Sequence, residues 1–460
     1  MVKQRKGGLS QRLLTWIQLL VLILMFWACC KGGYMPRYDT DIGSRDQQLL
    51  LLLYAVVLVS LEKNYSALRV GLLRVSELIY SQGLAVSISA AFMYMVASIY
   101  YHQLMPIIPM ILLLLIQGVF CVVWTYIANA QYFRTHRRPK TAIIYRSLAD
   151  KAKIESIRYY NEHFDVQKEI ENPPDDIHAL MKELEGFKVV FVAGVNATLR
   201  NGIVKFCVEQ DMHGYIVPHL GDIIMGGAEY LSMFSVPIMK VERAEVHSEY
   251  LVFKRIMDIA LALIGTIFTG PIMLAAACAI RCYDGGPALY KQTRLTKDGR
   301  TFEIYKFRSM RVDAEKDGVA RLASENDDRI TPIGKFIRAT RIDELPQLIN
   351  ILRGDMSIVG PRPERPEIAE QYIKQMPEFS LRLQVKAGLT GMAQVYGRYN
   401  TEPYSKLQMD LMYVNEMSLR TDIRLILATI KILFMRESTQ GIQNGQTTAA
   451  DGYADNRKSA

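Results

Sequence analysis

Four apolar segments fill the first third of this 460-residue chain and limit what it can fold into. They run over residues 13–30, 47–61, 83–101 and 104–126, and the second is the shortest. A helix of about 20 apolar residues crosses the hydrocarbon core of a bilayer, where every backbone polar group needs an internal partner. Hydrophobic residues also make up 50% of the whole chain, which is high for a soluble protein. We therefore predict a membrane protein with four transmembrane helices in residues 1–130.

Basic residues indicate how these helices are oriented. They precede the first segment, lie between the second and third, and follow the fourth at Arg134, Arg137, Arg138 and Lys140. In the loop after the first segment, acidic residues offset the charge of the basic residues. Because loops rich in Lys and Arg stay in the cytoplasm, the N-terminus and the chain from residue 130 onward are expected on the cytoplasmic face.

The chain becomes soluble in character after residue 140. The runs TAIIY, FDVQKEI, FKVVFVAG and GYIVP are typical of strands, and polar helical stretches separate them. This alternation predicts a degenerate Rossmann-like domain over residues 141–245. The first strand-to-helix turn contains Arg146 and Ser147 and no glycine, so a dinucleotide motif is absent. We expect a structural or regulatory role for this domain.

A fifth apolar stretch, residues 256–280, is long enough to span the membrane. Basic residues flank both of its ends, and Gly270 and Pro271 interrupt its middle. Proline breaks the helical hydrogen-bond ladder and favours a sharp bend. A spanning helix would also carry everything after Arg281 out of the cell, away from nucleotide-activated substrates. We therefore favour a re-entrant helix over residues 254–281, with a fifth span as the alternative.

One short run carries the strongest chemical pattern. Asp343 and Glu344 are adjacent, ahead of an apolar helix. Asp343 alone could be a helix N-cap, because aspartate caps helices well and Pro346 is tolerated in a first turn. Six cations that could bind phosphate favour a catalytic carboxylate over a helix cap: Lys306, Arg308, Arg338, Arg341, Arg362 and Arg398. A carboxylate among so many cations is expected to stay ionised at neutral pH and to attack phosphorus.

Two further features favour a phosphorylated substrate. Arg362 lies between two prolines, which fix the backbone and reduce the freedom lost when its guanidinium binds a phosphate. A pyrophosphate usually arrives with Mg²⁺ held by one or two carboxylates, here Asp343 and Glu344, with Asp313 and Asp355 as alternatives. The net charge of +9 fits phosphate substrates and anionic lipid rather than nucleic acid, because no DNA-binding motif accompanies the arginines.

The end of the chain adds a second membrane-surface element. Residues 421–436 are apolar but place Arg424 and Lys431 on one helical face. That pattern is typical of a helix in the headgroup layer, and a core helix with two snorkelling cations is the alternative. The polar residues 438–460 are expected to be disordered.

Residues 254 to about 437 closely resemble the bacterial sugar transferase family, the polyprenyl-phosphate hexose-1-phosphate transferases or monotopic phosphoglycosyl transferases. The similar segments are FKRIMDI, LYKQTRLTKDGRTFEIYKFRSM, TPIGKFIRATRIDELPQLINILRGDMSIVGPRP, VKAGLTGMAQVYGR and KLQMDLMYV. The four helices and the Rossmann-like domain ahead of them resemble the long-form members. The fold expected is a membrane protein, α plus α/β, whose mostly helical catalytic domain covers residues 250–437.

The resemblance implies transfer of hexose-1-phosphate from a UDP-hexose to undecaprenyl phosphate at the cytoplasmic face of the bacterial inner membrane, with Mg²⁺. It implies Asp343 and Glu344 as the catalytic pair, and Lys306, Arg338, Arg362 and Arg398 as phosphate ligands. An aspartyl-phosphosugar intermediate, glucose ahead of galactose, and initiation of capsule or exopolysaccharide synthesis are expected. Direct transfer with Asp343 only binding metal, an inactive membrane scaffold, and a homodimer remain open.

Overall fold

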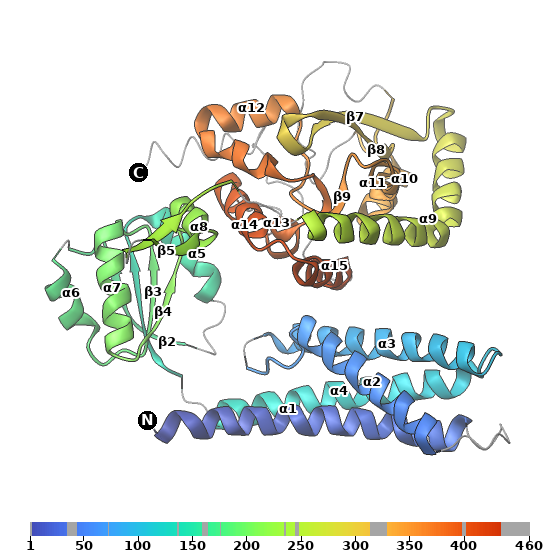
Figure 1. Ribbon diagram of the computed structural model, residues 1–460, viewed down its shortest axis with the longest axis horizontal. Helices are drawn as coiled ribbons and strands as arrows, with labels where there is room; N and C mark the ends of the chain where they lie inside the picture. The colour runs from blue at the N-terminus through green and yellow to red at the C-terminus, as the bar shows by residue number, and fades with distance from the viewer. Residues whose placement is uncertain are drawn as a thin grey trace. The chain divides into compact units, whose positions relative to one another are not determined.

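The computed structural model describes residues 2–34, 44–71, 73–135, 138–158, 164–174, 176–233, 236–243, 248–312, 329–397 and 402–433. It divides the chain into two compact units, Met1–Val217 and Pro218–Ala460. Figure 1 shows the elements of both units. The expected mixture of membrane-type helices and an α/β part is confirmed. The tail from 438 to 460 and Arg398 lie outside the described residues.

The first unit begins with four helices: α1 (Val2–Cys29), α2 (Ser44–Asn64), α3 (Val75–Tyr100) and α4 (Ile107–Thr135). By length and composition, four helices among the described residues could cross a membrane: Arg12–Gly32, α3, α4 and α9 (Ser248–Asp284). The segment expected as the second span is the helix α2, which does not belong to this set. Three of the four spans expected in residues 1–130 therefore have the length and composition of a membrane-spanning helix. The apolar stretch expected over residues 256–280 has them as well.

Some polar side chains inside this helical bundle form hydrogen bonds from one helix to another. The amide of Gln117 on α4 donates to the hydroxyl of Tyr54 on α2, at 2.9 Å, and to the carbonyl of Leu22 on α1, at 3.0 Å. All three residues are completely buried. Such contacts fix which faces of apolar helices meet, because lipid itself offers no hydrogen-bonding partner.

The same unit contains a parallel sheet in the order β2-β1-β3-β4. Its strands are β1 (Lys140–Tyr145), β2 (Asp165–Glu171), β3 (Val189–Ala193) and β4 (His213–Ile216), and its helices are α5 (Leu148–Arg158), α6 (Ile177–Leu184) and α7 (Ala197–Glu209). Apolar clusters lie on both faces of β1 and β3, as expected for a buried parallel sheet. The four strands occupy the runs predicted from the sequence.

The second unit is mostly helical. Its helices are α8 (Leu220–Gly226), α9, α10 (Pro332–Ala339), α11 (Gln347–Arg353), α12 (Pro366–Gln375), α13 (Met392–Tyr396), α14 (Pro403–Asn415) and α15 (Leu419–Leu433), with short turns η3 (Lys297–Gly299), η4 (Ile342–Glu344) and η5 (Pro377–Gln384). Its strands form three pairs: β5 (Glu229–Met233) with β6 (Val236–Lys240), β7 (Leu289–Leu295) with β8 (Thr301–Phe307), and β9 (Ser357–Val359) with β10 (Gly388–Thr390).

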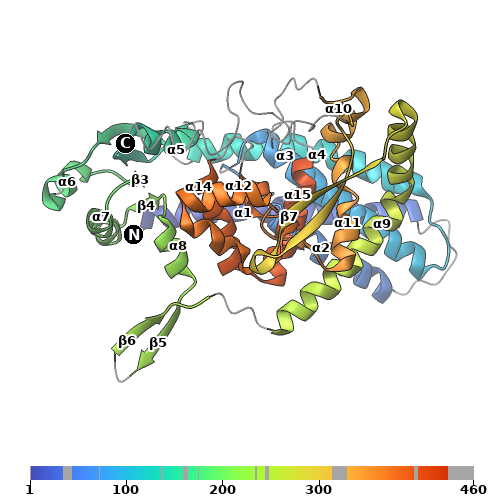
Figure 2. The same ribbon diagram turned by 90° about the horizontal axis from the view of Figure 1, so that it is seen from above.

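Helix α9 is 37 residues long and contains Pro271. Figures 1 and 2 show that it turns sharply partway along its length. Pro271 cannot donate a helical hydrogen bond, and the hydroxyls of Thr266 and Thr269 bond to carbonyls four residues earlier, which also bends helices. Helix α9 thus changes direction while remaining one continuous helix that contains Pro271.

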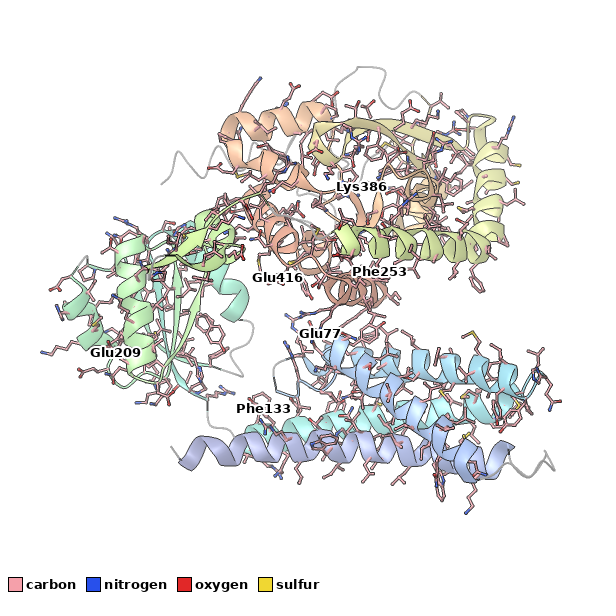
Figure 3. The ribbon with its side chains drawn as sticks, in the orientation of Figure 1. Glu77, Phe133, Glu209, Phe253, Lys386 and Glu416 are labelled. Carbon is pink, nitrogen blue, oxygen red and sulfur yellow. The ribbon has the colours of Figure 1, made fainter. Side chains whose placement is uncertain are left out.

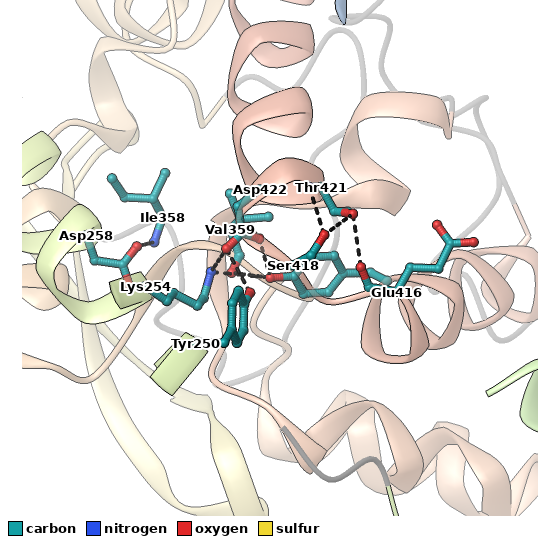
Figure 4. A network of polar contacts seen from close by, with 10 residues as sticks. Tyr250, Lys254, Asp258, Ile358, Val359, Glu416, Ser418, Thr421 and Asp422 are labelled. Carbon is teal, nitrogen blue, oxygen red and sulfur yellow. Dashed lines mark hydrogen bonds and ion pairs between the residues drawn. The ribbon is translucent and has the colours of Figure 1, made fainter. Parts of the chain in front are cut away.

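A buried polar network joins the start of α9 to α14 and α15 (Figure 4). The ammonium of Lys254 lies 2.8 Å from Oδ2 of Asp422, whose side chain is fully buried. The hydroxyls of Tyr250 and Tyr413 donate to the same carboxylate, each at 2.8 Å. One turn further along α9, Asp258 accepts a hydrogen bond from the backbone of Ile358 on β9. The apolar helix is thereby anchored to the soluble part of the unit.

Replacing Asp422 with alanine should destabilise the second unit by about 3–5 kcal/mol, because it leaves the Lys254 ammonium buried without its counter-charge. The matched control is Glu303→Ala, which breaks an exposed ion pair with Lys291 and should cost less than about 1 kcal/mol. Guanidinium unfolding of the full chain measures both changes. Equal shifts of the two midpoints would contradict the anchoring role.

Candidate active site

Asp343 and Glu344 lie in the tight turn η4, between α10 and α11. Helix α10 begins at Thr331, whose hydroxyl accepts from the amide of Gly334, and it ends after Ala339. Arg341 then adopts a left-handed backbone conformation with φ of 58°, which reverses the chain direction. Neither η4 nor α11 has a side-chain N-cap, and α11 starts after Pro346. The structure therefore offers no support for Asp343 as a helix cap.

One oxygen of Glu344 is the centre of a cation cluster. Oε1 lies 3.0 Å from Nη2 of Arg362, 3.7 Å from Nη1 of Arg341 and 3.9 Å from Nζ of Lys306. The side chain of Glu344 is only 14% exposed. Burial alone would raise its pKa, but Arg362, Lys306 and Arg341 outweigh that effect and lower the pKa to about 2. Glu344 is therefore ionised throughout the physiological range.

Asp343 has a different environment from its neighbour. Its Oδ1 atom is buried and has no hydrogen-bond partner among the described residues. Burial and the charge of Glu344 raise its pKa, although Lys306, Arg338 and Arg341 oppose that shift. The sequence placed Asp343 among the cations, whereas Lys306, Arg341 and Arg362 make their ion pairs with Glu344. A raised pKa makes the Asp343 carboxylate more basic, and its Oδ1 is not engaged by a hydrogen bond within the described residues.

Lys306 reaches the cluster from strand β8, which is held against α11 by a buried asparagine. Asn350 accepts from the backbone amide of Tyr305 at 2.9 Å and donates to the carbonyl of Glu303 at 2.7 Å. These contacts fix the strand immediately before Lys306. Burial, together with the charges of Arg362 and Arg294, lowers the pKa of Lys306 to about 8, although Glu344 and Asp343 oppose that shift. This ammonium is therefore poised to titrate near neutral pH.

Arg362 is positioned by a backbone that only glycine allows. A Cβ on Gly360 would lie 2.4 Å from the carbonyl oxygen of Lys386, and one on Gly388 would lie 2.1 Å from the backbone nitrogen of Gly360. The amide of Gly360 donates to the carbonyl of Thr390 at 2.8 Å, and the amide of Gly388 donates to Pro361 at 2.9 Å. The chain therefore enters the turn Pro361-Arg362-Pro363 along a fixed path.

Two further arginines hold this turn and were not assigned a role from the sequence. Arg382 donates to the carbonyl of Arg362 at 2.8 Å and forms a buried ion pair with Asp410 at 2.7 Å. Arg294 donates to the carbonyl of Pro363 at 3.0 Å. Arg294 lies in the YKQTR segment, which could have indicated it. The surroundings of Arg382 carry no comparable pattern.

The other predicted phosphate ligands do not all lie beside the carboxylate pair. Arg338 and Arg341 act electrostatically on Asp343. Arg308 is buried and pairs with Asp284 at the end of α9, so its charge already has a counter-ion outside the Glu344 cluster. Arg398 cannot be placed, because it lies outside the described residues. The structure thus brings together Lys306, Arg341 and Arg362 around the carboxylate pair.

The carboxylate pair fits a magnesium site of the kind completed by substrate. Among the described residues, no cluster of three or more His, Cys, Asp or Glu side chains could hold a metal on its own. Mg²⁺ commonly uses one or two carboxylates and takes its remaining ligands from phosphate and water. The unpartnered Oδ1 of Asp343 beside ionised Glu344 meets that requirement.

Comparison with known proteins places this geometry in context. Residues 249–436 match the family model described as bacterial sugar transferase. The chain is 40% identical over 190 residues to the UDP-glucose:undecaprenyl-phosphate glucose-1-phosphate transferase of Caulobacter vibrioides, covering 40% of this chain and 71% of that protein.

Other relatives differ in the sugar that their names contain. The galactosyl transferase CpsE of Streptococcus agalactiae is 39% identical over 238 residues, covering 47% of this chain and 52% of that protein. The UDP-N-acetylgalactosamine-undecaprenyl-phosphate N-acetylgalactosaminephosphotransferase of Aeromonas hydrophila is 40% identical over 187 residues, covering 40% and 44%. The matched part thus spans about half the length of these two relatives. Together with the coverage of the Caulobacter protein, these matches show that the chain belongs to the bacterial sugar transferase family.

Proposed function

We propose that this protein transfers hexose-1-phosphate from a UDP-hexose to undecaprenyl phosphate and releases UMP. The observation that carries this proposal is the convergence of three cations on Oε1 of Glu344 beside the buried, unpartnered Oδ1 of Asp343. Guanidinium and ammonium groups held in place by a buried carboxylate suit a pyrophosphate, which brings its own negative charge. The names of the relatives support the same reaction class.

In the first step, the carboxylate of Asp343 attacks the sugar-side phosphorus of the UDP-hexose. A bond forms between that phosphorus and the Asp343 oxygen, and the bond to the UMP oxygen breaks. Lys306, Arg341 and Arg362 offset the negative charge that develops on the phosphate oxygens. Bound Mg²⁺, held by Asp343 and Glu344, would neutralise further phosphate charge. The hexose phosphate is then linked to Asp343 as an acyl phosphate.

In the second step, a phosphate oxygen of undecaprenyl phosphate attacks the same phosphorus and displaces the Asp343 carboxylate. The acceptor's polar head stays at the membrane surface because its tail is in the bilayer. A re-entrant α9, anchored at Lys254, would hold the site at that depth on the cytoplasmic face of the bacterial inner membrane. Glucose is the favoured hexose and galactose the next, and initiation of capsule or exopolysaccharide synthesis is the proposed role.

Two alternatives have distinct consequences. Direct transfer in a ternary complex would leave Asp343 to bind metal only, and no covalent intermediate would form. An inactive membrane scaffold would have no need of the ionised Glu344 and its three cations. The parallel α/β part, which we propose to be Rossmann-like, would have a structural or regulatory role in either case, and a homodimer is compatible with all of these schemes.

Asp343→Asn should lower the rate of sugar-phosphate transfer by roughly 10³-fold or more, because an amide is a very poor nucleophile for phosphorus. The matched control is Asp298→Asn, which changes an exposed carboxylate in the η3 turn and should leave the rate near that of the wild type. Release of UMP from UDP-glucose in the presence of undecaprenyl phosphate measures both. A rate within tenfold of the wild type for Asp343→Asn would remove Asp343 from the nucleophile's role.

The alkaline limb of the pH profile should report Lys306. Its pKa is lowered to about 8, so raising the pH through 8 removes a positive charge from the phosphate site. The value of kcat/KM for the UDP-sugar should then fall by up to about tenfold per pH unit. Lys306→Arg keeps its charge at these pH values and should move the fall to higher pH. An unchanged alkaline limb in that variant would show that another group controls it.

The re-entrant topology predicts that both ends of α9 face the cytoplasm. Single cysteines at Ser248 and Tyr283, both exposed, would be introduced after replacement of the six native cysteines. In intact cells, a membrane-impermeant thiol reagent should label neither position until the cells are lysed. Labelling at 283 from outside, with 248 protected, would establish α9 as a true span and refute this topology.

A further inference from the structure

A second group of cations gathers away from the Glu344 cluster, at the start of α9. One helix and two loops contribute to it, and we call these residues the basic patch: Arg255, Lys297, Arg300 and Lys386. A Cβ added to Gly354 would lie 3.5 Å from Nη2 of Arg255 and 3.8 Å from Nζ of Lys386, so these two cations flank one point on the surface. The proposed transfer mechanism uses none of the four.

Backbone and hydroxyl contacts hold the loops of the basic patch together. The hydroxyl of Thr296 donates to the carbonyl of Asp355 at 2.9 Å and accepts from the amide of Ala387 at 3.2 Å. One buried side chain thereby links the η3 turn, the end of α11 and the loop that contains Lys386. Arg255 donates to the carbonyls of Ile351 and Leu352 at the C-terminus of α11. The cations are therefore presented by a fixed framework.

The carboxylates close to the basic patch are engaged elsewhere. Asp258 accepts from the backbone of Ile358, Asp298 pairs with Arg243, and Asp355 accepts from the amide of Asn350. Within the described part of the chain, no hydrogen bond or ion pair is made by the ammonium of Lys386. Burial is the largest cause of the lowered pKa of Lys386; the charges of Arg255, Arg300 and Lys297 lower it further and Asp258 raises it, so three cations and one carboxylate act on this ammonium.

An apolar surface adjoins this excess of positive charge. Val252, Phe253 and Ile256, within one turn of Arg255 on α9, are each 58% exposed. Figure 3 shows Phe253 on this helix and Lys386 in the same unit. Exposed apolar side chains beside a group of cations match the boundary of a bilayer, where acyl chains meet phosphate groups.

We propose that the basic patch binds the phosphate headgroup of an anionic phospholipid while the adjoining face of α9 contacts its acyl chains. The phosphodiester would lie among Arg255, Arg300 and Lys386, where it supplies the missing negative charge. This site differs from that of the acceptor lipid, whose phosphate must reach Asp343. It would make binding of the second unit to the membrane depend on anionic lipid.

Native mass spectrometry of the detergent-solubilised full chain tests this site without any need for transferase activity. The probes are phosphatidylglycerol and phosphatidylcholine with identical acyl chains. The wild type should bind phosphatidylglycerol preferentially, and the double change Lys386→Gln with Arg300→Gln should weaken that binding by about 30-fold, or about 2 kcal/mol. Binding of phosphatidylcholine should stay unchanged, which also shows that the variant is folded.

The matched control is Lys291→Gln, which removes one exposed cation from the same β7–β8 hairpin and should change phosphatidylglycerol binding by less than twofold. If Lys291→Gln weakened phosphatidylglycerol binding as much as the double change does, net charge alone would explain the result and the proposal would be overturned. Equal binding of the two lipids by the wild type would also overturn it. Displacement of the lipid by millimolar inorganic phosphate would assign the basic patch to free phosphate and overturn the lipid assignment.

Discussion

The geometry of the candidate site depends on a single, mostly buried carboxylate oxygen, Oε1 of Glu344. Lys306, Arg341 and Arg362 carry like charges and would repel one another in a partly dehydrated site without a common counter-ion. Glu344 supplies that counter-ion and remains ionised because its pKa is lowered to about 2. It leaves Asp343 beside the same cations but without a hydrogen bond on Oδ1. The two adjacent carboxylates thus have opposite pKa shifts and different surroundings: Glu344 contacts three cations, and Oδ1 of Asp343 has no hydrogen bond among the described residues.

The rest of the second unit connects this cluster to the apolar helix α9. The carboxylate of Asp422 binds Lys254 on α9 and accepts from the hydroxyl of Tyr413, whose oxygen lies 3.2 Å from the carbonyl oxygen of Val359. Val359 is followed directly by Gly360 and the turn that contains Arg362. A displacement of α9 would therefore be transmitted through these contacts to the turn that contains Arg362.

The sequence predicted those parts of the fold and site that rest on local patterns. Apolar length indicated the helices, alternation indicated the four parallel strands, and Pro271 indicated the bend. Spacing alone could not show that the cations would contact Glu344 rather than Asp343, because that depends on how η4 faces β8. Arg308 was predicted as a phosphate ligand, but the fold brings it to Asp284. Asn350 and Arg382 act through backbone carbonyls and amides of distant segments, a relation that no sequence pattern encodes.

The central claim is that Asp343 forms a covalent bond to the sugar phosphate before the acceptor reacts. The most direct test is the intact mass of the full chain incubated with UDP-glucose and Mg²⁺ but without undecaprenyl phosphate, followed by peptide mapping. An added mass of one hexose phosphate is expected on the peptide that contains Asp343, and it should disappear when undecaprenyl phosphate is supplied. Absence of any adduct in a preparation that forms lipid-linked product would contradict it and establish direct transfer.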